Sequence, residues 1–193
     1  MLLHGDVLVA CLSFLQAKEI ALIFRVSPTW SRTEAQVWRS GVLFPLQFFF
    51  RLKPAMQQHV IAIDNPCYGG YNPDRSLYGK LPDNNIKIWR VAAADVISNI
   101  SISPASWHLD HLILHSFHWP MVFWQWKVFS PVGSTLRKIT LELGHILPSL
   151  KFLLGFTALH SLHFVCPPKL VRHIRHALEE LPHLKDVPVV FRT

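Results

Sequence analysis

The stretch "LDHLIL" (residues 109–114) carries leucines at its first, fourth and sixth positions. The same spacing of apolar residues returns in "LRKITL" (136–141) and "LHSLHF" (159–164), and a weaker copy starts at Leu184. The starts of these copies are 27, 23 and 25 residues apart. Counting back by similar steps reaches two further copies, Asp83-Ile86-Ile88 and Gln58-Ile61-Ile63. About six copies with a period in this range predict a repeat architecture.

The segments between the copies have the character of helices, turns and one long loop. "PPKLVRHIRHALEELP" (167–182) has prolines at both ends and one apolar stripe, which predicts a helix. Residues 121–129 and 148–156 are shorter candidates, and residues 64–85, rich in Gly, Pro, Asn and Tyr, predict a loop. The alternative is an ordinary α/β domain with leucine-rich buried strands, against which the regular spacing argues.

This pattern resembles a leucine-rich repeat, a solenoid of parallel strands with helices on its convex side. Regular repeats carry Asn or Cys shortly after the last leucine; here those positions hold Phe117, Gly144 and Pro167, with Cys166 one place early, so irregular repeats are expected. The resemblance implies that strand residues between the leucines line a concave target-binding face, where histidines would make target affinity depend on pH near neutrality. The predicted target-binding residues are Asn85, Lys87, Trp89, His111, Ile113, His115, Lys138, Thr140, Glu142, Ser161 and His163.

The N-terminal region predicts short amphipathic helices rather than a secretory signal. The leading "MLLHG" contains no Lys or Arg, and a signal peptide needs a positive charge there. Apolar residues between Val7 and Leu15 form one helical stripe behind Asp6, a fair N-cap. A second helix ends before Pro28, and a third spans residues 30–38. Three short helices in about 40 residues do not close a good core by themselves, so they need a partner.

The order Leu3, Asp6-Val7-Leu8, Leu12-Ser13-Phe14-Leu15, Glu19-Ile20, Val26-Ser27, Trp30 and Trp38-Arg39 resembles an F-box over residues 2–41. His4 stands where that family has a proline. The expected fold class is therefore α/β, with a three-helix F-box (1–45) followed by a leucine-rich-repeat domain (46–193). The resemblance implies docking to a Skp-family adaptor, and through it to a cullin, with Trp38 packing the helices onto the repeats. The expected adaptor-binding residues are Leu3, Leu8, Leu12, Leu15, Ile20, Val26 and Trp30.

Together the two resemblances imply the substrate-recognition subunit of a Skp/cullin/F-box ubiquitin ligase, bound to an unknown target protein and located in the cytoplasm, the nucleus or both. Neither a catalytic motif nor a metal-ligand or cofactor-binding motif is found, so we expect a non-enzyme with no cofactor and no metal. The longest apolar run is too short for a membrane span, so no membrane partner is expected.

Two alternatives stay open. The net charge of +7 also suits a leucine-rich scaffold that associates with RNA or a ribonucleoprotein, although nucleic acid is not the expected partner because the basic residues are spread out. An F-box protein that binds the adaptor without serving ubiquitination would have the same sequence features.

Overall fold

The computed structural model describes residues 34–65, 86–92, 109–115 and 133–193. Within these residues the protein is an α/β structure built on one seven-stranded sheet. Its strands are β1 (Phe44–Pro45), β2 (Ala62–Asn65), β3 (Ile88–Ala92), β4 (His111–His115), β5 (Lys138–Glu142), β6 (Ser161–Val165) and β7 (Val189–Arg192).

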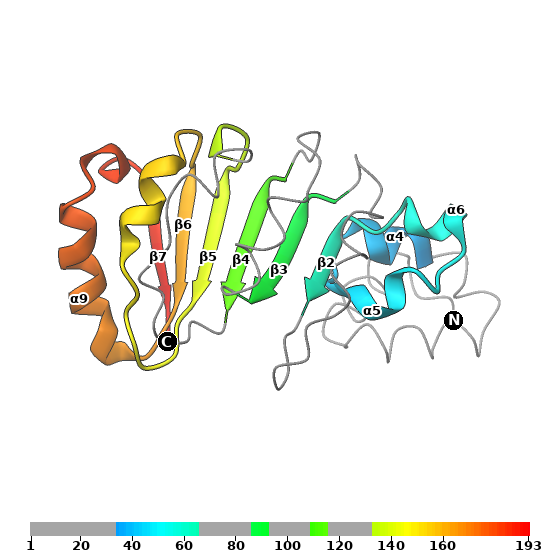
Figure 1. Cartoon of the computed structure of the whole chain (residues 1–193), viewed down its shortest axis with the longest axis horizontal. Coiled ribbons are helices and arrows are strands. Elements are labelled where there is room, and N and C mark those ends of the chain that lie inside the picture. The colour runs from blue at the N-terminus through cyan, green and yellow to red at the C-terminus, as the bar shows by residue number, and fades with distance from the viewer. Residues whose placement is uncertain (1–33, 66–85, 93–108, 116–132) are drawn as a thin grey trace, which may run out of the picture.

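Every neighbouring pair of strands is parallel, and the order across the sheet is the order along the chain (Figure 1). Each strand therefore needs a crossover connection before the next one can lie beside it in the same direction. A sheet that grows by one strand per crossover is compatible with the repeat architecture that the sequence predicts.

The described helices gather at the two ends of the sheet. Figure 1 shows three of them near β2 and the longest, α9, beside β7. They are α4 (Glu34–Arg39), α5 (Leu46–Phe49), α6 (Pro54–Gln57), α9 (Pro168–Glu179) and the 3-10 helices η3 (Leu150–Gly155) and η4 (Pro182–Leu184). None of the described helices is long and apolar enough to span a membrane.

One face of the sheet packs on the hydrophobic core. Strand side chains alternate between the two faces, so the fourth and sixth positions of each copy point to the same side. In β4 these are Leu112 and Leu114, both fully buried, and their equivalents in β5 and β6 are buried as well. Helix α9 covers this core with Leu170 and Ile174, as its predicted apolar stripe requires.

The core continues into the N-terminal part of the chain through Trp38. This side chain is fully buried on α4, and its ring meets Phe44 of β1 edge to face at 4.8 Å. Its indole Nε1 donates a hydrogen bond to Glu34 Oε1 at 3.1 Å. Trp38 thus joins α4 to the sheet.

Toward both ends of the sheet the predicted copies are displaced from the observed ones. Trp89, not Ile86, pairs with Leu112, so the third strand starts later than predicted. In the same way Val189 pairs with Leu162, two residues from its predicted partner Phe164. The shift in β7 is two residues, so each side chain stays on its predicted face of the sheet. The shift in β3 is three residues, so each side chain lies on the face opposite to the predicted one.

A candidate interaction surface on the sheet

The side chains that point away from the core form one continuous surface, which we call the polar face. Register places them in rows that cross the strands, such as Asp64, Arg90 and Ile113 followed by Thr140 and His163. The polar face consists of Asp64, Ile88, Arg90, His111, Ile113, His115, Lys138, Thr140, Glu142, Ser161, His163, Val165, Val190 and Arg192.

The structure brings together all the predicted target-binding residues of the three central strands. Two of them, His115 and Thr140, are only 7% and 9% exposed, so little of either side chain is accessible to a partner. The members that lie together on the polar face are His111, Ile113, His115, Lys138, Thr140, Glu142, Ser161 and His163.

The prediction for the third strand is wrong. Trp89 is 1% exposed and belongs to the core, because its real register partner is Leu112. Lys87 precedes β3, and the residues of β3 that the polar face gains instead are Ile88 and Arg90. The missed signal is the spacing Ile86, Trp89, Val91, which repeats the leucine pattern with aromatic and β-branched residues. Asn85 lies outside the described residues.

Arg90 is the centre of an ion-pair cluster that spans four strands. Its Nη1 lies 3.1 Å from Asp64 Oδ1 on β2, and its Nη2 lies 2.6 Å from Glu142 Oε2 on β5. Its Nε also donates to Glu142 Oε1 at 3.1 Å, which completes a two-point guanidinium–carboxylate contact. All three side chains are only 20–29% exposed, so water screens the cluster weakly.

These contacts determine the charge states of the cluster. The hydrogen bond to Glu142 is the main reason that the pKa of Arg90 is raised, so the guanidinium stays charged. Burial raises the pKa of Asp64. Arg90 and, to a smaller extent, His115 act in the opposite direction but do not cancel the effect of burial. The cluster therefore links β2, β3 and β5 on the polar face through one guanidinium shared by two carboxylates.

His111 on β4 shares a hydrogen bond of 2.9 Å between its Nε2 and Thr140 Oγ1 on β5. Burial, together with the smaller effects of Lys138 and His163, lowers the pKa of His111 to about 4. Burial also lowers the pKa of His163, with contributions from Lys138 and Arg192. His111 is thus neutral at physiological pH, and the pH dependence expected near neutrality does not apply to it.

The β5–β7 half of the polar face is basic. Lys138, His163 and Arg192 lie on the successive strands β5, β6 and β7. His163 lies two residues beyond Ser161, the register partner of Lys138, and Arg192 lies two residues beyond Val190, the register partner of His163. The three side chains therefore form a diagonal across the strands. Within the described parts of the chain no carboxylate forms a salt bridge with any of these three side chains. The polar face therefore has two electrostatic halves: one in which Arg90 is paired with two carboxylates, and one in which Lys138 and Arg192 form no salt bridge within the described residues.

The adaptor-binding positions Leu3, Leu8, Leu12, Leu15, Ile20, Val26 and Trp30 all lie outside the described residues. In the four described segments no group of three or more His, Cys, Asp or Glu side chains is placed to hold a metal ion.

In comparisons with known proteins, no family model matches this chain, and no curated protein or solved structure matches it.

Proposed function

We propose that the chain is a non-catalytic substrate-recognition subunit of a Skp/cullin/F-box ubiquitin ligase. The N-terminal helices bind the adaptor, and the polar face binds the target protein. The observation that supports this proposal best is the sheet of parallel strands in chain order. Its first strand begins six residues after Trp38, and Trp38 belongs to the same hydrophobic core as the sheet. A repeat-like sheet directly after the helices that resemble an F-box suits a receptor of this kind.

The mechanism of such a subunit is positional. A target held on the polar face is brought near the ubiquitin-conjugating enzyme, which raises the effective concentration of its lysines. A rigid surface serves this role well because it loses little conformational freedom on binding. The Arg90 cluster supports the proposal, since it ties strands β2, β3 and β5 together on the surface that contacts the target.

The test is co-purification of residues 1–193 with a Skp-family adaptor. The wild-type chain should form a complex that survives high salt, because an apolar interface depends little on ionic strength. A Leu15→Ala/Trp30→Ala variant should lose the complex, since truncating such anchors commonly costs about 2 kcal/mol or more each. A Val190→Ala variant on the polar face is the matched control and should keep it. A folded wild-type chain that forms no complex would refute the proposal.

A second candidate function is favoured by Lys138 and Arg192, the two cations of the basic diagonal, which form no salt bridge with a carboxylate in the described structure. These cations suit a scaffold that associates with RNA. Nucleic-acid binding falls steeply with salt, so a complex with single-stranded RNA that weakens strongly between low and high salt would favour the scaffold. A Lys138→Gln/Arg192→Gln variant should then show a smaller salt slope.

A further inference from the structure

The two edges of the described sheet differ in how they end. Strand β1 has only two residues, and one of them, Pro45, has no backbone N–H to offer to another strand. Strand β7 has four residues, and its sequence, Val189 to Arg192, is rich in β-branched and aromatic side chains. Short strands and prolines protect sheet edges from pairing, so the β1 edge is protected and the β7 edge is not.

The backbone of β7 presents a defined set of groups at that edge. The carbonyl oxygens of Pro188 and Arg192 accept hydrogen bonds from the N–H groups of Leu162 in β6 and of Cys166 directly after β6, at 3.0 Å each. Backbone groups alternate along a strand, so the N–H and C=O groups of Val189 and Phe191 point to the opposite side, away from β6. Among the described residues no strand pairs with β7 on that side.

The core beneath β7 is also incompletely covered. Leu162 and Phe164 of β6 are fully buried, whereas their register partners Val189 and Phe191 are half-buried. Phe191 stacks on Phe164 with ring centroids 5.5 Å apart, so it belongs to the core that continues from β6. No further strand lies beyond β7 among the described residues to supply the next row of apolar side chains, so Val189 and Phe191 remain partly exposed.

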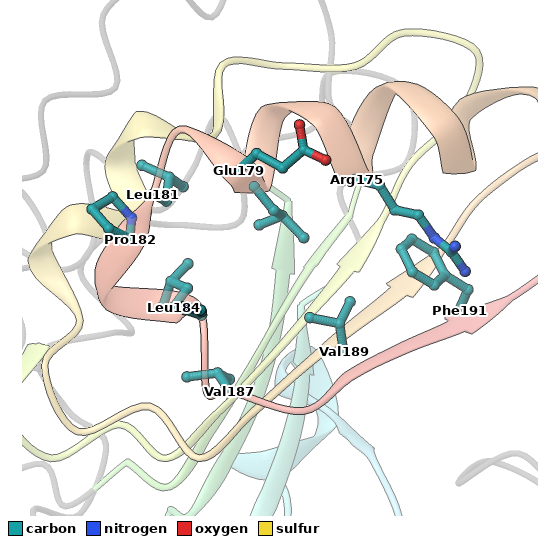
Figure 2. A pocket seen from close by; sticks show the side chains of 10 residues that line it. Arg175, Glu179, Leu181, Pro182, Leu184, Val187, Val189 and Phe191 are labelled. Atoms are coloured by element: carbon teal, nitrogen blue, oxygen red, sulfur yellow. The ribbon is translucent and has the colours of Figure 1, made fainter.

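A groove lies where that row would be. It has a volume of about 580 Å³ between α9 and β7, and its floor is mostly apolar (Figure 2). Figure 2 shows Leu181, Leu184 and Val187 along one end of it and Val189 and Phe191 along the strand. The guanidinium of Arg175 lies over the ring of Phe191, 5.5 Å from its centroid, at the opposite end.

The charges around this edge favour an acidic partner. Arg175 and Lys185 line the groove, and Arg192 stands on the other face of β7. The one carboxylate in the lining, Glu179, already contacts His176 at 3.1 Å. Strand β7 carries no carboxylate between Val189 and Arg192, so a second copy paired through β7 would leave Arg192 without an acidic partner, and charge does not favour it as the occupant.

We propose that the outer edge of β7 accepts an extended segment of a partner protein as an eighth strand. The residues of that segment opposite Val189 and Phe191 are apolar and enter the groove under α9. The residue opposite Arg192 is acidic. Strand addition of this kind takes its affinity from backbone hydrogen bonds and its specificity from alternate side chains. The inference does not depend on adaptor binding or ubiquitination.

The test measures how a labelled peptide binds to the full chain by fluorescence anisotropy. The peptide reads serine, glutamate, isoleucine, threonine, isoleucine, glutamate, serine, a palindrome that fits the edge in either strand direction. Val189→Pro removes a backbone N–H that points away from β6, so it should lower affinity by about tenfold or more while leaving the β6–β7 pairing intact. Val189→Thr keeps both the shape and the N–H and serves as its control.

A charge exchange keeps the test decisive if Val189→Pro does not fold. Arg192→Glu should weaken the glutamate peptide about threefold to fivefold and strengthen a lysine version by a similar factor, as exposed ion pairs do. Unchanged affinity in a folded Val189→Pro chain, or no response to the charge exchange, would overturn the proposal. Dimers of the wild-type chain in sedimentation that Val189→Pro abolishes would also overturn it, since a second copy would then hold the edge.

Discussion

Replacing Arg90 by leucine should destabilise the protein markedly, because it leaves two carboxylates close together on the polar face without their common partner. The guanidinium contacts Asp64 and Glu142 at 3.1 and 2.6 Å, and the side chains are 20–29% exposed. Breaking a buried ion pair costs about 3–5 kcal/mol and an exposed one about 0–1 kcal/mol. For this partly buried cluster we expect a loss of about 2–3 kcal/mol at pH 7, measured by urea unfolding followed by tryptophan fluorescence.

The same variant has a predictable response to acid. Burial already raises the pKa of Asp64 above its usual value of 3.8, and Arg90 opposes that rise, so the pKa should rise further in Arg90→Leu. A carboxyl whose folded pKa exceeds its unfolded pKa destabilises the fold above the folded pKa, and this cost disappears as the pH falls toward 3.8. The difference between wild type and Arg90→Leu should therefore shrink between pH 7 and about pH 4.

A matched control separates charge from packing. In the triple variant Asp64→Asn/Arg90→Leu/Glu142→Gln no charge is left without a partner, so it should be more stable than Arg90→Leu alone. Stability of Arg90→Leu within about 0.5 kcal/mol of wild type would refute this reasoning, since that is the range of ordinary surface substitutions. A loss that grows on acidification would also refute it.

Three further predictions use the same unfolding assay. Trp38→Ala should cost about 3–5 kcal/mol and Trp38→Phe clearly less, because the buried ring joins α4 to the sheet; equal losses would contradict that role. Gly133→Ala should cost more than about 2 kcal/mol, since its Cβ would meet the Gly155 carbonyl oxygen, whereas Gly144→Ala, with open space around it, should change stability by less than about 0.5 kcal/mol. The pKa of His111 is about 4 in the folded protein and 6.5 in the unfolded chain. As the pH falls from 6.5 to 4, the unfolded chain takes up the proton first, so the stability that is present above pH 6.5 is lost over this range. His111→Gln should therefore reduce the acid loss over this window by about 1–3 kcal/mol, and an unchanged loss would argue against a buried neutral imidazole.

The sequence predicted the central strands well because their copies combine leucine spacing with strand alternation. In β4, β5 and β6 the apolar positions are occupied by Leu, Ile or Phe, and the residues between them lie on the polar face as expected. Helix α9 was equally readable from its prolines and its apolar stripe.

The ends of the sheet were harder to predict because their copies use other residues. Trp89 and Val91 fill the leucine positions of β3, and a count based on isoleucines alone was three residues early. That odd shift placed Trp89 on the wrong face and left Arg90 out of the predicted surface.

The ion-pair cluster could not have been predicted from any local pattern. Arg90 and Glu142 are 52 positions apart in the chain, and only the register of four strands brings them together. The incomplete cover of Val189 and Phe191 likewise follows from the position of β7 at the edge of the described sheet. Features of this kind depend on which strands are neighbours, and periodicity alone does not specify that.

The most direct test of the account as a whole is reconstitution of the full chain with a Skp-family adaptor and a cullin, followed by size-exclusion chromatography with light scattering. We expect one species whose mass equals one copy of each component, and in the Leu15→Ala/Trp30→Ala variant we expect only this chain to be lost from it. A folded wild-type chain that elutes apart from an intact adaptor–cullin complex would contradict the account.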